Sequence, residues 1–309
     1  MRWCALSEQI PHIPVLLNEV CDIFKDIKSG TIVDATLGYG GHSEAILKLN
    51  SNTKLFGIDR DSEAIAFSSK RLSVFADRVQ FFHGDFGSAI ATAPSDVMGV
   101  LADIGVSSLQ LDKNERGFGF EGDTLDMRMD ISQEFSAYDV VNSYSEADLV
   151  KIIDEYGEDR YAKKIASTIV NARKKAKITS SKELAELISK GVPRGKLHPA
   201  TLTFQAIRIE VNDELGQLKA LLSGAKKLAK PGMLLAIISF HSLEDRIVKQ
   251  TFKEWSRNCI CDADAMRCEC GGKNALGEIV SKKLIEAAPL EIRSNPRSRS
   301  AKLRVFRFN

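Results

Sequence analysis

The sequence predicts an α/β fold, a doubly wound and mostly parallel sheet that carries an inserted all-α domain. Three observations lead to this prediction. Apolar runs alternate with stretches of helical spacing as far as about residue 103, and a glycine-rich turn follows the first run. The alternation then stops between about residues 115 and 196, and resumes afterwards. An interruption of this size is typical of one domain inserted into another.

The first element is the segment Thr31 to His42, which reads TIVDATLGYGGH. An apolar run reaches Asp34, three glycines follow, and residues 43–49 have helical spacing. A strand, a tight turn and a helix open many nucleotide-binding sheets. Ser43 stands where a dinucleotide fingerprint has its third glycine, and the acidic residue precedes the turn. This favours S-adenosylmethionine, whose cationic groups suit a carboxylate, although a turn without any ligand is the alternative.

Further strands are predicted at residues 54–58, 79–83 and 98–102, with helical stretches between them. Asp59 directly follows the first of these runs, and Asp103 follows the last. Because the carboxyl ends of parallel strands meet at one edge, where ligands bind, we expect these carboxylates at a ligand site.

The segment from about 115 to 196 shows no strong strand pattern. Capping pairs at residues 145–148 and 180–183 each begin a predicted helix that ends at a glycine. The predicted domains are a first sheet part at 1–114, a helical substrate-recognition insert at 115–197, and a second sheet part at 198–309. Pro199 is expected in the first turn of a long helix that runs, with a break, to Leu228.

After this helix, residues 233–240 predict a fifth strand, and His241 follows it at the same edge. Two late runs, at 277–285 and 302–308, are predicted to form paired edge strands. His42 is either a ligand contact or an ordinary residue of a first helical turn.

Composition is ordinary for a globular protein of 309 residues, with 44% hydrophobic and 27% charged residues. No apolar run approaches the ~18 residues of a membrane helix, and the first residues lack a signal-peptide pattern, so a cytoplasmic protein without a membrane partner is expected. The net charge of +2 does not mark a nucleic-acid binder. Six basic residues nevertheless gather near the end and can hold a phosphate backbone: Arg293, Arg297, Arg299, Lys302, Arg304 and Arg307.

Four of the six cysteines form a C-x-C-x6-C-x-C pattern: Cys259, Cys261, Cys268 and Cys270. Four thiolates can hold a zinc ion tetrahedrally. The usual structural spacing is C-x2-C, however, and the shorter C-x-C strains the chelate. Free thiols in a loop are the alternative, and no metal site is assigned.

Three residues are candidates for chemistry at the sheet edge. Asp59 can accept both ribose hydroxyls of an adenosine ligand, a device that NAD enzymes share, or it can serve the N-terminus of the next helix. Phe86 either packs near an adenine ring or belongs to the core. Asp103 can hold an amino N–H of a substrate, as methyl transfer to an exocyclic amine requires, or it can cap the turn at Gly105.

Two other functions share parts of this pattern. A nicotinamide-dependent oxidoreductase would use the same glycine turn and Asp59. A non-catalytic RNA-binding assembly factor would use the basic end of the chain, but it leaves the row of strand-end acids unexplained.

Ten blocks of the sequence, in order along nearly the whole chain, resemble one family. They are HIPVLLNEV (12–20), DATLGYGGHS (34–43), GIDRD (57–61), DIGVSSLQLD (103–112), ERGFGF (115–120), LDMRMD (125–130), HPAT (198–201), FQAIR (204–208), ISFHSLEDRIV (238–248) and NPRSRSAKLR (295–304). The family is that of the bacterial small-subunit ribosomal RNA cytosine-N4 methyltransferases, known as RsmH or MraW.

The resemblance implies a class I AdoMet-dependent methyltransferase fold, Rossmann-like, with an antiparallel C-terminal strand and an inserted helical domain. It implies methylation of the N4 amino group of a decoding-centre cytidine in 16S rRNA within the small ribosomal subunit, and it leaves a homodimer open. Asp103 would be catalytic. The S-adenosylmethionine contacts that the resemblance implies are Gly40, Gly41, His42, Asp59, Phe86, Asp103 and Gln110.

Overall fold

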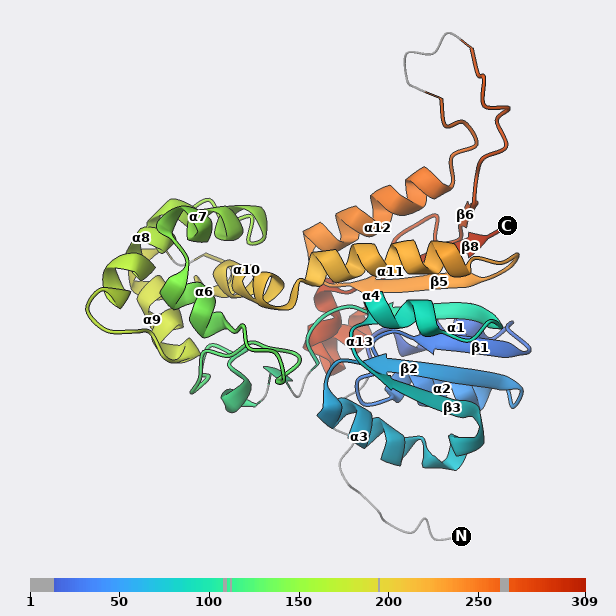
Figure 1. Cartoon of the computed structure of the whole chain (residues 1–309), viewed down its shortest axis with the longest axis horizontal. Helices are drawn as coiled ribbons and strands as arrows, with labels where there is room; N and C mark the ends of the chain where they lie inside the picture. The colour runs from blue at the N-terminus through green and yellow to red at the C-terminus, as the bar shows by residue number, and fades with distance from the viewer. Residues whose placement is uncertain (1–13, 108–109, 112, 194, 262–266) are drawn as a thin grey trace. The chain divides into compact units, whose positions relative to one another are not determined.

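The computed structural model describes residues 14–107, 110–111, 113–193, 195–261 and 267–309. Residues 12, 13, 108, 109 and 112 of the family blocks lie outside this part. The chain divides into two compact units, one made of Met1–Gly105 with Gln217–Asn309 and the other of Val106–Gly216 (Figure 1). The helical unit thus takes in residues 106–114 and 198–216, which the sequence-based boundaries assign to the sheet parts.

In the described residues of the sheet unit, eight strands form one sheet in the order β3-β2-β1-β4-β5-β8-β6, with β7 paired to β8. Their bounds are β1 Gly30–Asp34, β2 Thr53–Asp59, β3 Val79–His83, β4 Val97–Asp103, β5 Leu234–Ser239, β6 Gly277–Ile279, β7 Ile285–Glu286 and β8 Lys302–Phe308. Strands β1 to β5 pair in parallel, whereas β8 is antiparallel to β5 and β6. The doubly wound sheet with an antiparallel C-terminal strand is confirmed. The prediction that both late strands lie at the edge is wrong for β8, which lies between β5 and β6.

Both faces of this sheet are covered, because successive strand residues point to opposite sides. Val33, Val100 and Ile237 belong to one buried cluster, and their neighbours Ile32, Leu101 and Ile238 belong to another. The first cluster includes apolar residues of α11 (Glu214–Leu228) and α12 (Ser242–Trp255), and the second includes those of α1 (Leu17–Phe24). Strands buried on both faces explain why the sequence shows continuous apolar runs there.

The remaining helices of the sheet unit connect the strands. They are α2 Gly41–Leu49, α3 Ser62–Arg71, α4 Phe86–Ala89 and α13 Pro289–Ser294, with short 3-10 helices at Ser73–Arg78, Ile90–Thr92 and Pro296–Ser300. Within the described residues, no helix is long and apolar enough to cross a membrane.

The helical unit contains α6 Ala137–Ser143, α7 Glu146–Glu155, α8 Ala162–Arg173, α9 Ser181–Gly191 and α10 Thr201–Asn212, with a 3-10 helix at Asn114–Arg116. The predicted caps are confirmed, since the hydroxyls of Ser145 and Ser180 accept backbone N–H bonds at 3.1 Å. The predicted break also exists, because Asp213 adopts a left-handed conformation between α10 and α11. Pro199 precedes α10 by two residues, so the prediction that it sits in the first turn is wrong.

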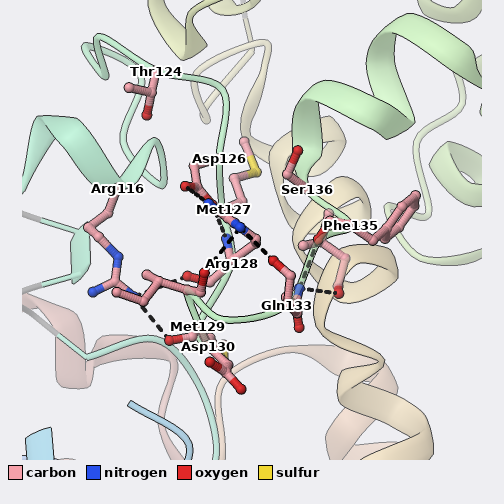
Figure 2. Close-up of polar contacts among 12 residues, drawn as sticks. Arg116, Thr124, Asp126, Met127, Arg128, Met129, Asp130, Gln133, Phe135 and Ser136 are labelled. Carbon is pink, nitrogen blue, oxygen red and sulfur yellow. Dashed lines mark hydrogen bonds and ion pairs between the residues drawn. The ribbon is translucent and has the colours of Figure 1, made fainter. Parts of the chain in front are cut away.

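An extended segment before α6 is held by its own polar contacts (Figure 2). The buried guanidinium of Arg116 donates to the carbonyl oxygens of Arg128 and Met129 at 3.1 and 3.0 Å. The guanidinium of Arg128 forms a two-pronged pair with the carboxylate of Asp126, at 2.7 and 2.9 Å. Asn212 of α10 accepts from the N–H of Met129 at 2.8 Å. These bonds satisfy a backbone that has no helix or strand partners, so the segment has a defined shape.

Candidate functional site

The register of the parallel strands brings the predicted carboxylates to one edge. Asp34 pairs with Gly57 of β2 on one side and with Leu101 of β4 on the other. Asp59 and Asp103 each lie two residues further along those neighbouring strands. All three therefore end their strands at the same edge, where ligands of such sheets bind.

Asp34 serves the loop itself. It is only 1% exposed; one of its carboxylate oxygens accepts the hydroxyl of Ser43 at 2.5 Å and the other accepts the N–H of Thr36 at 3.3 Å. Burial raises the pKa of this carboxyl above its usual value. Asp34 thus braces the glycine turn rather than facing a ligand, contrary to the expectation drawn from its place before the turn. Ser43, which broke the dinucleotide fingerprint, is the residue that makes this brace.

The turn needs glycine at two positions. Gly38 and Gly40 have positive φ values of 50° and 71°, and Gly40 is the N-cap of α2. A Cβ on Gly40 would also lie 3.3 Å from side-chain atoms of Leu72 and Ser68. Gly41 has an ordinary φ, but a Cβ there would lie 2.4 Å from Pro14. Neighbouring side chains therefore leave little room for a side chain at Gly40 and Gly41, the two predicted cofactor glycines.

Asp59 is joined to this turn. Its carboxylate accepts the N–H of Gly38 at 2.7 Å and that of Asp61 at 2.9 Å. Burial raises the pKa of Asp59 to about 6 in spite of these two bonds. The N-cap of α3 is Asp61, whose side chain accepts the N–H of Glu63. Asp61, and not Asp59, therefore caps α3. The carboxylate of Asp59 is hydrogen-bonded to the glycine turn instead.

Asp103 and His42 form the centre of the edge. Nε2 of His42 lies 3.6 Å from Oδ2 of Asp103, and their side chains are 8% and 20% exposed. The backbone N–H of Asp103 donates to the hydroxyl of Thr36 at 2.6 Å. Among the described residues, Oδ1 of Asp103 and both ring nitrogens of His42 have no hydrogen-bond partner. Buried polar atoms are rarely left unpaired, so these three atoms are candidate ligand contacts at this edge.

The other two predicted cofactor residues differ in position. Phe86 is the first residue of α4, is 9% exposed and belongs to the core cluster on one face of the sheet. The guanidinium carbon of Arg60 lies 5.8 Å from the centre of its ring. Gln110 belongs to the helical unit, where its side-chain oxygen accepts the N–H of Ser107 at 3.0 Å. Its role as a cofactor contact stays a prediction.

His241 is the N-cap of α12, directly after β5, and it forms a buried pair that the sequence analysis missed. Its Nε2 lies 3.1 Å from Oε1 of Glu244, which is fully buried. The other oxygen of Glu244 accepts the backbone N–H groups of Phe240 and His241 at 2.9 and 3.3 Å. A Glu three residues into a helix is a capping-box signal, and it was available in the sequence HSLE.

The basic residues at the end of the chain differ in how far they are exposed. Arg304 forms a two-pronged pair with Asp245 at 2.7 and 3.1 Å and is 15% exposed, so it is not free to hold a phosphate. Arg293, Arg297 and Arg299 are exposed. The predicted basic surface is therefore smaller than the sequence implied.

Comparisons with known proteins give the site a context. The chain matches the MraW methylase family over residues 9–309. It is 59% identical to the ribosomal RNA small subunit methyltransferase H of a Nitratiruptor species, over 96% of this chain and 98% of that one. It is 58% identical to the enzyme of the same name from Aliarcobacter butzleri, over 97% and 99% of the two chains.

A solved structure of an rRNA methylase from Streptococcus thermophilus is similar at a TM-score of 0.41 and 10% identity, over 96% of this chain and 98% of that one. The order of the sheet, with its antiparallel C-terminal strand, is that of a class I methyltransferase. A methylase family goes against the nicotinamide-dependent alternative. From the match over residues 9–309 and the identity to full-length relatives, the chain belongs to the MraW methylase family.

Proposed function

We propose that this protein methylates the N4 amino group of a decoding-centre cytidine in 16S rRNA, with S-adenosylmethionine as the methyl donor. The names of its relatives support a small-subunit rRNA substrate. The observation that carries the site is the set of unpaired buried atoms on Asp103 and His42, at the edge where the strands end.

The residues at this edge fit the proposed donor. Asp59 offers a carboxylate to the two ribose hydroxyls, and the turn from Gly38 to Gly41 lets a ligand approach the backbone closely. His42, in the first turn of α2, has two ring nitrogens available for partners. S-adenosylmethionine supplies a methyl group carried on a positively charged sulfur, and the carboxylates at the edge suit that charge.

Asp103 is the proposed catalytic residue. Its unpaired Oδ1 can accept an N–H of the cytosine amino group, which holds the nitrogen and directs its lone pair. An amine that gains a methyl group must lose one proton, and a carboxylate in this position can receive it. Nε2 of His42 lies 3.6 Å from the other oxygen of Asp103, so both side chains would face the same ligand.

The helical unit and the exposed arginines near the end of the chain are the proposed RNA contacts. Arg293, Arg297 and Arg299 are exposed on and near the 3-10 helix Pro296–Ser300. Arginine pairs well with phosphate oxygens because its planar group donates two parallel hydrogen bonds. These contacts would position the RNA without selecting a base.

The test combines labelled S-adenosylmethionine with small ribosomal subunits that lack the modification, followed by mapping of the label at single-nucleotide resolution. We expect label at N4 of one cytidine, and we expect Asp103→Ala to lower the rate by about 100-fold or more. Asp22→Ala, on the exposed face of α1, is the matched control and should retain the wild-type rate. Label found on protein, or on another base, would reject the substrate; a wild-type rate in D103A would reject the role of Asp103.

A further inference from the structure

The described parts of the connection between α12 and β6, residues 256–261 and 267–276, project away from the sheet (Figure 1). The described part of it contains no helix or strand, and none of its described residues is buried. Ile260 is 63% exposed. Backbone bonds close its base, from Leu276 to Trp255 at 2.7 Å and from Asn274 to Asn258 at 3.1 Å. A segment this long without a core of its own needs another source of order.

Four cysteine sulfurs meet in this connection. The sulfur atoms of Cys259, Cys261, Cys268 and Cys270 all lie within 4.8 Å of one another. Cys268 lies 3.6 Å from both Cys259 and Cys270, and Cys259 lies 3.7 Å from Cys270. A disulfide needs sulfurs about 2.05 Å apart, so these are four separate thiols.

The spacing of three sulfurs matches one face of a tetrahedron around one ion, and the fourth, that of Cys261, lies within 4.8 Å of each of them. With zinc–sulfur bonds of about 2.3 Å, the sulfurs of a tetrahedral site lie about 3.8 Å apart. The three measured separations are within ~0.2 Å of that value. A multi-iron cluster would attach its cysteines to different metal atoms and spread them further apart. The spacing therefore favours a single ion.

The two C-x-C segments face each other in a reciprocal arrangement. The N–H of Ile260, the middle residue of the first segment, donates to the sulfur of Cys270 at 3.4 Å. The N–H of Glu269, the middle residue of the second, donates to the sulfur of Cys261 at 3.3 Å. Such bonds stabilise thiolates, which are the form that binds metal. Each segment thus holds a sulfur of the other. The two sulfurs of the second C-x-C lie 3.6 Å apart, close to the tetrahedral value, so this spacing places both around one ion.

We propose that Cys259, Cys261, Cys268 and Cys270 bind one structural zinc ion that orders the connection between α12 and β6. All four positions around the ion are taken by sulfur, which is typical of structural rather than catalytic zinc. The site lies within the sheet unit, and it is independent of the proposed methyl transfer.

The first test measures metal in the purified full-length protein by mass spectrometry of the elements. We expect about one zinc per chain, and almost none in the double variant Cys259→Ser/Cys270→Ser. Cys21→Ser, a change of the half-buried thiol in α1, is the matched control and should retain zinc. Iron in place of zinc, or zinc retained by the double variant, would overturn the proposal.

A second test reports on geometry and does not depend on a variant that folds. The protein is stripped with a chelator and refilled with Co²⁺, and its visible absorption is recorded. Four thiolates around Co²⁺ give strong tetrahedral bands, and adding Zn²⁺ should abolish them. Absence of those bands in protein that remains folded by circular dichroism would refute the site.

A third test reports on the structural effect. Arg257, Arg267 and Lys273 are exposed in the connection, so trypsin can cut there once the segment loosens. We expect metal removal to accelerate cleavage at these residues, and added Zn²⁺ to restore resistance. Equal cleavage rates with and without zinc would overturn the structural role.

Discussion

Lowering the pH from 7 to 5 should weaken the binding of S-adenosylmethionine through Asp59. The pKa of this carboxyl is raised to about 6 by burial, so the side chain is mostly ionised at pH 7 and mostly protonated at pH 5. The ribose hydroxyls of S-adenosylmethionine would donate hydrogen bonds to the ionised carboxylate of Asp59, so the ligand would bind the ionised form of the protein and not the protonated form. The dissociation constant should then rise about tenfold over these two pH units, nearly all of it below pH 6.

The assay is calorimetric titration of S-adenosylmethionine at several pH values between 5 and 7, where the ligand's amino group stays protonated. Asp59→Asn is the control, because an amide does not titrate; its single oxygen keeps one of the two bonds that separate carboxylate oxygens accept from Gly38 and Asp61. D59N should bind S-adenosylmethionine more weakly at pH 7, and its dissociation constant should change less with pH. The difference between the wild-type and D59N pH profiles gives the contribution of Asp59. Parallel profiles in the two proteins would refute the reasoning.

The same raised pKa has a consequence for the stability of the free protein. A carboxyl whose pKa is raised on folding holds its proton more tightly in the folded state than in the unfolded chain. Its contribution to stability is therefore fully present below pH 4 and is lost as the pH rises through about 6. A bound ligand that prefers the ionised carboxylate would reverse this trend.

Three further predictions follow from buried polar contacts. Ser43→Ala removes the 2.5 Å bond to Asp34 and should lower the free energy of unfolding, measured by urea titration, by about 1–3 kcal/mol. The control Ser69→Ala, at an exposed position, should change this free energy by less than about 0.5 kcal/mol. Equal shifts in the two variants would contradict a stabilising role for the bond between Ser43 and Asp34. Asn212→Ala removes hydrogen bonds to Met129, Met127 and Arg208 and should lower the free energy of unfolding by about 2–3 kcal/mol. The control Asn171→Ala, at an exposed position, should leave this free energy unchanged. An unchanged free energy of unfolding in N212A would show that the segment before α6 is held by other contacts. Arg304→Ala removes the two-pronged pair with Asp245, whose other ion pair, to Lys302, is longer at 3.9 Å, and it should lower the unfolding midpoint. Arg299→Ala should leave the midpoint unchanged and reduce the salt dependence of RNA binding by about one ion; the reverse pattern would assign the RNA contact to Arg304.

The sheet could be predicted from sequence because its parallel strands are buried on both faces and appear as continuous apolar runs. Strand β8 could not be placed in the same way. The run at 302–308 mixes three basic with four apolar residues, which is typical of an edge strand, yet β8 lies between β5 and β6. The basic side chains are tolerated there because Arg304 pairs with Asp245 and Arg307 lies 3.5 Å from Glu278. Both partners are far away in the sequence, and no local pattern reveals them.

At the candidate site, the acidic residues at the strand ends could be predicted from the sequence, but the different contacts of their carboxylates could not. In the sequence, Asp34, Asp59 and Asp103 each come at the end of an apolar run, so nothing there distinguishes their roles. The structure separates them by burial and by what their oxygens accept: Asp34 is 1% exposed and both of its oxygens accept bonds from nearby residues of the chain, both oxygens of Asp59 accept N–H groups, and Asp103 keeps an unpaired oxygen. The helix α6 was missed because it has only seven residues, too few for helical periodicity to appear.

The position of β8 bears on how the protein is synthesised. Residues 302–308 are translated after every other strand, yet they supply the neighbour of β5, β6 and β7. Until this segment leaves the ribosomal tunnel, β5 presents an open row of backbone groups that invites wrong pairing. A nascent chain that stalls before residue 302 would thus carry a finished glycine turn and an unfinished sheet, with β5 open along one side.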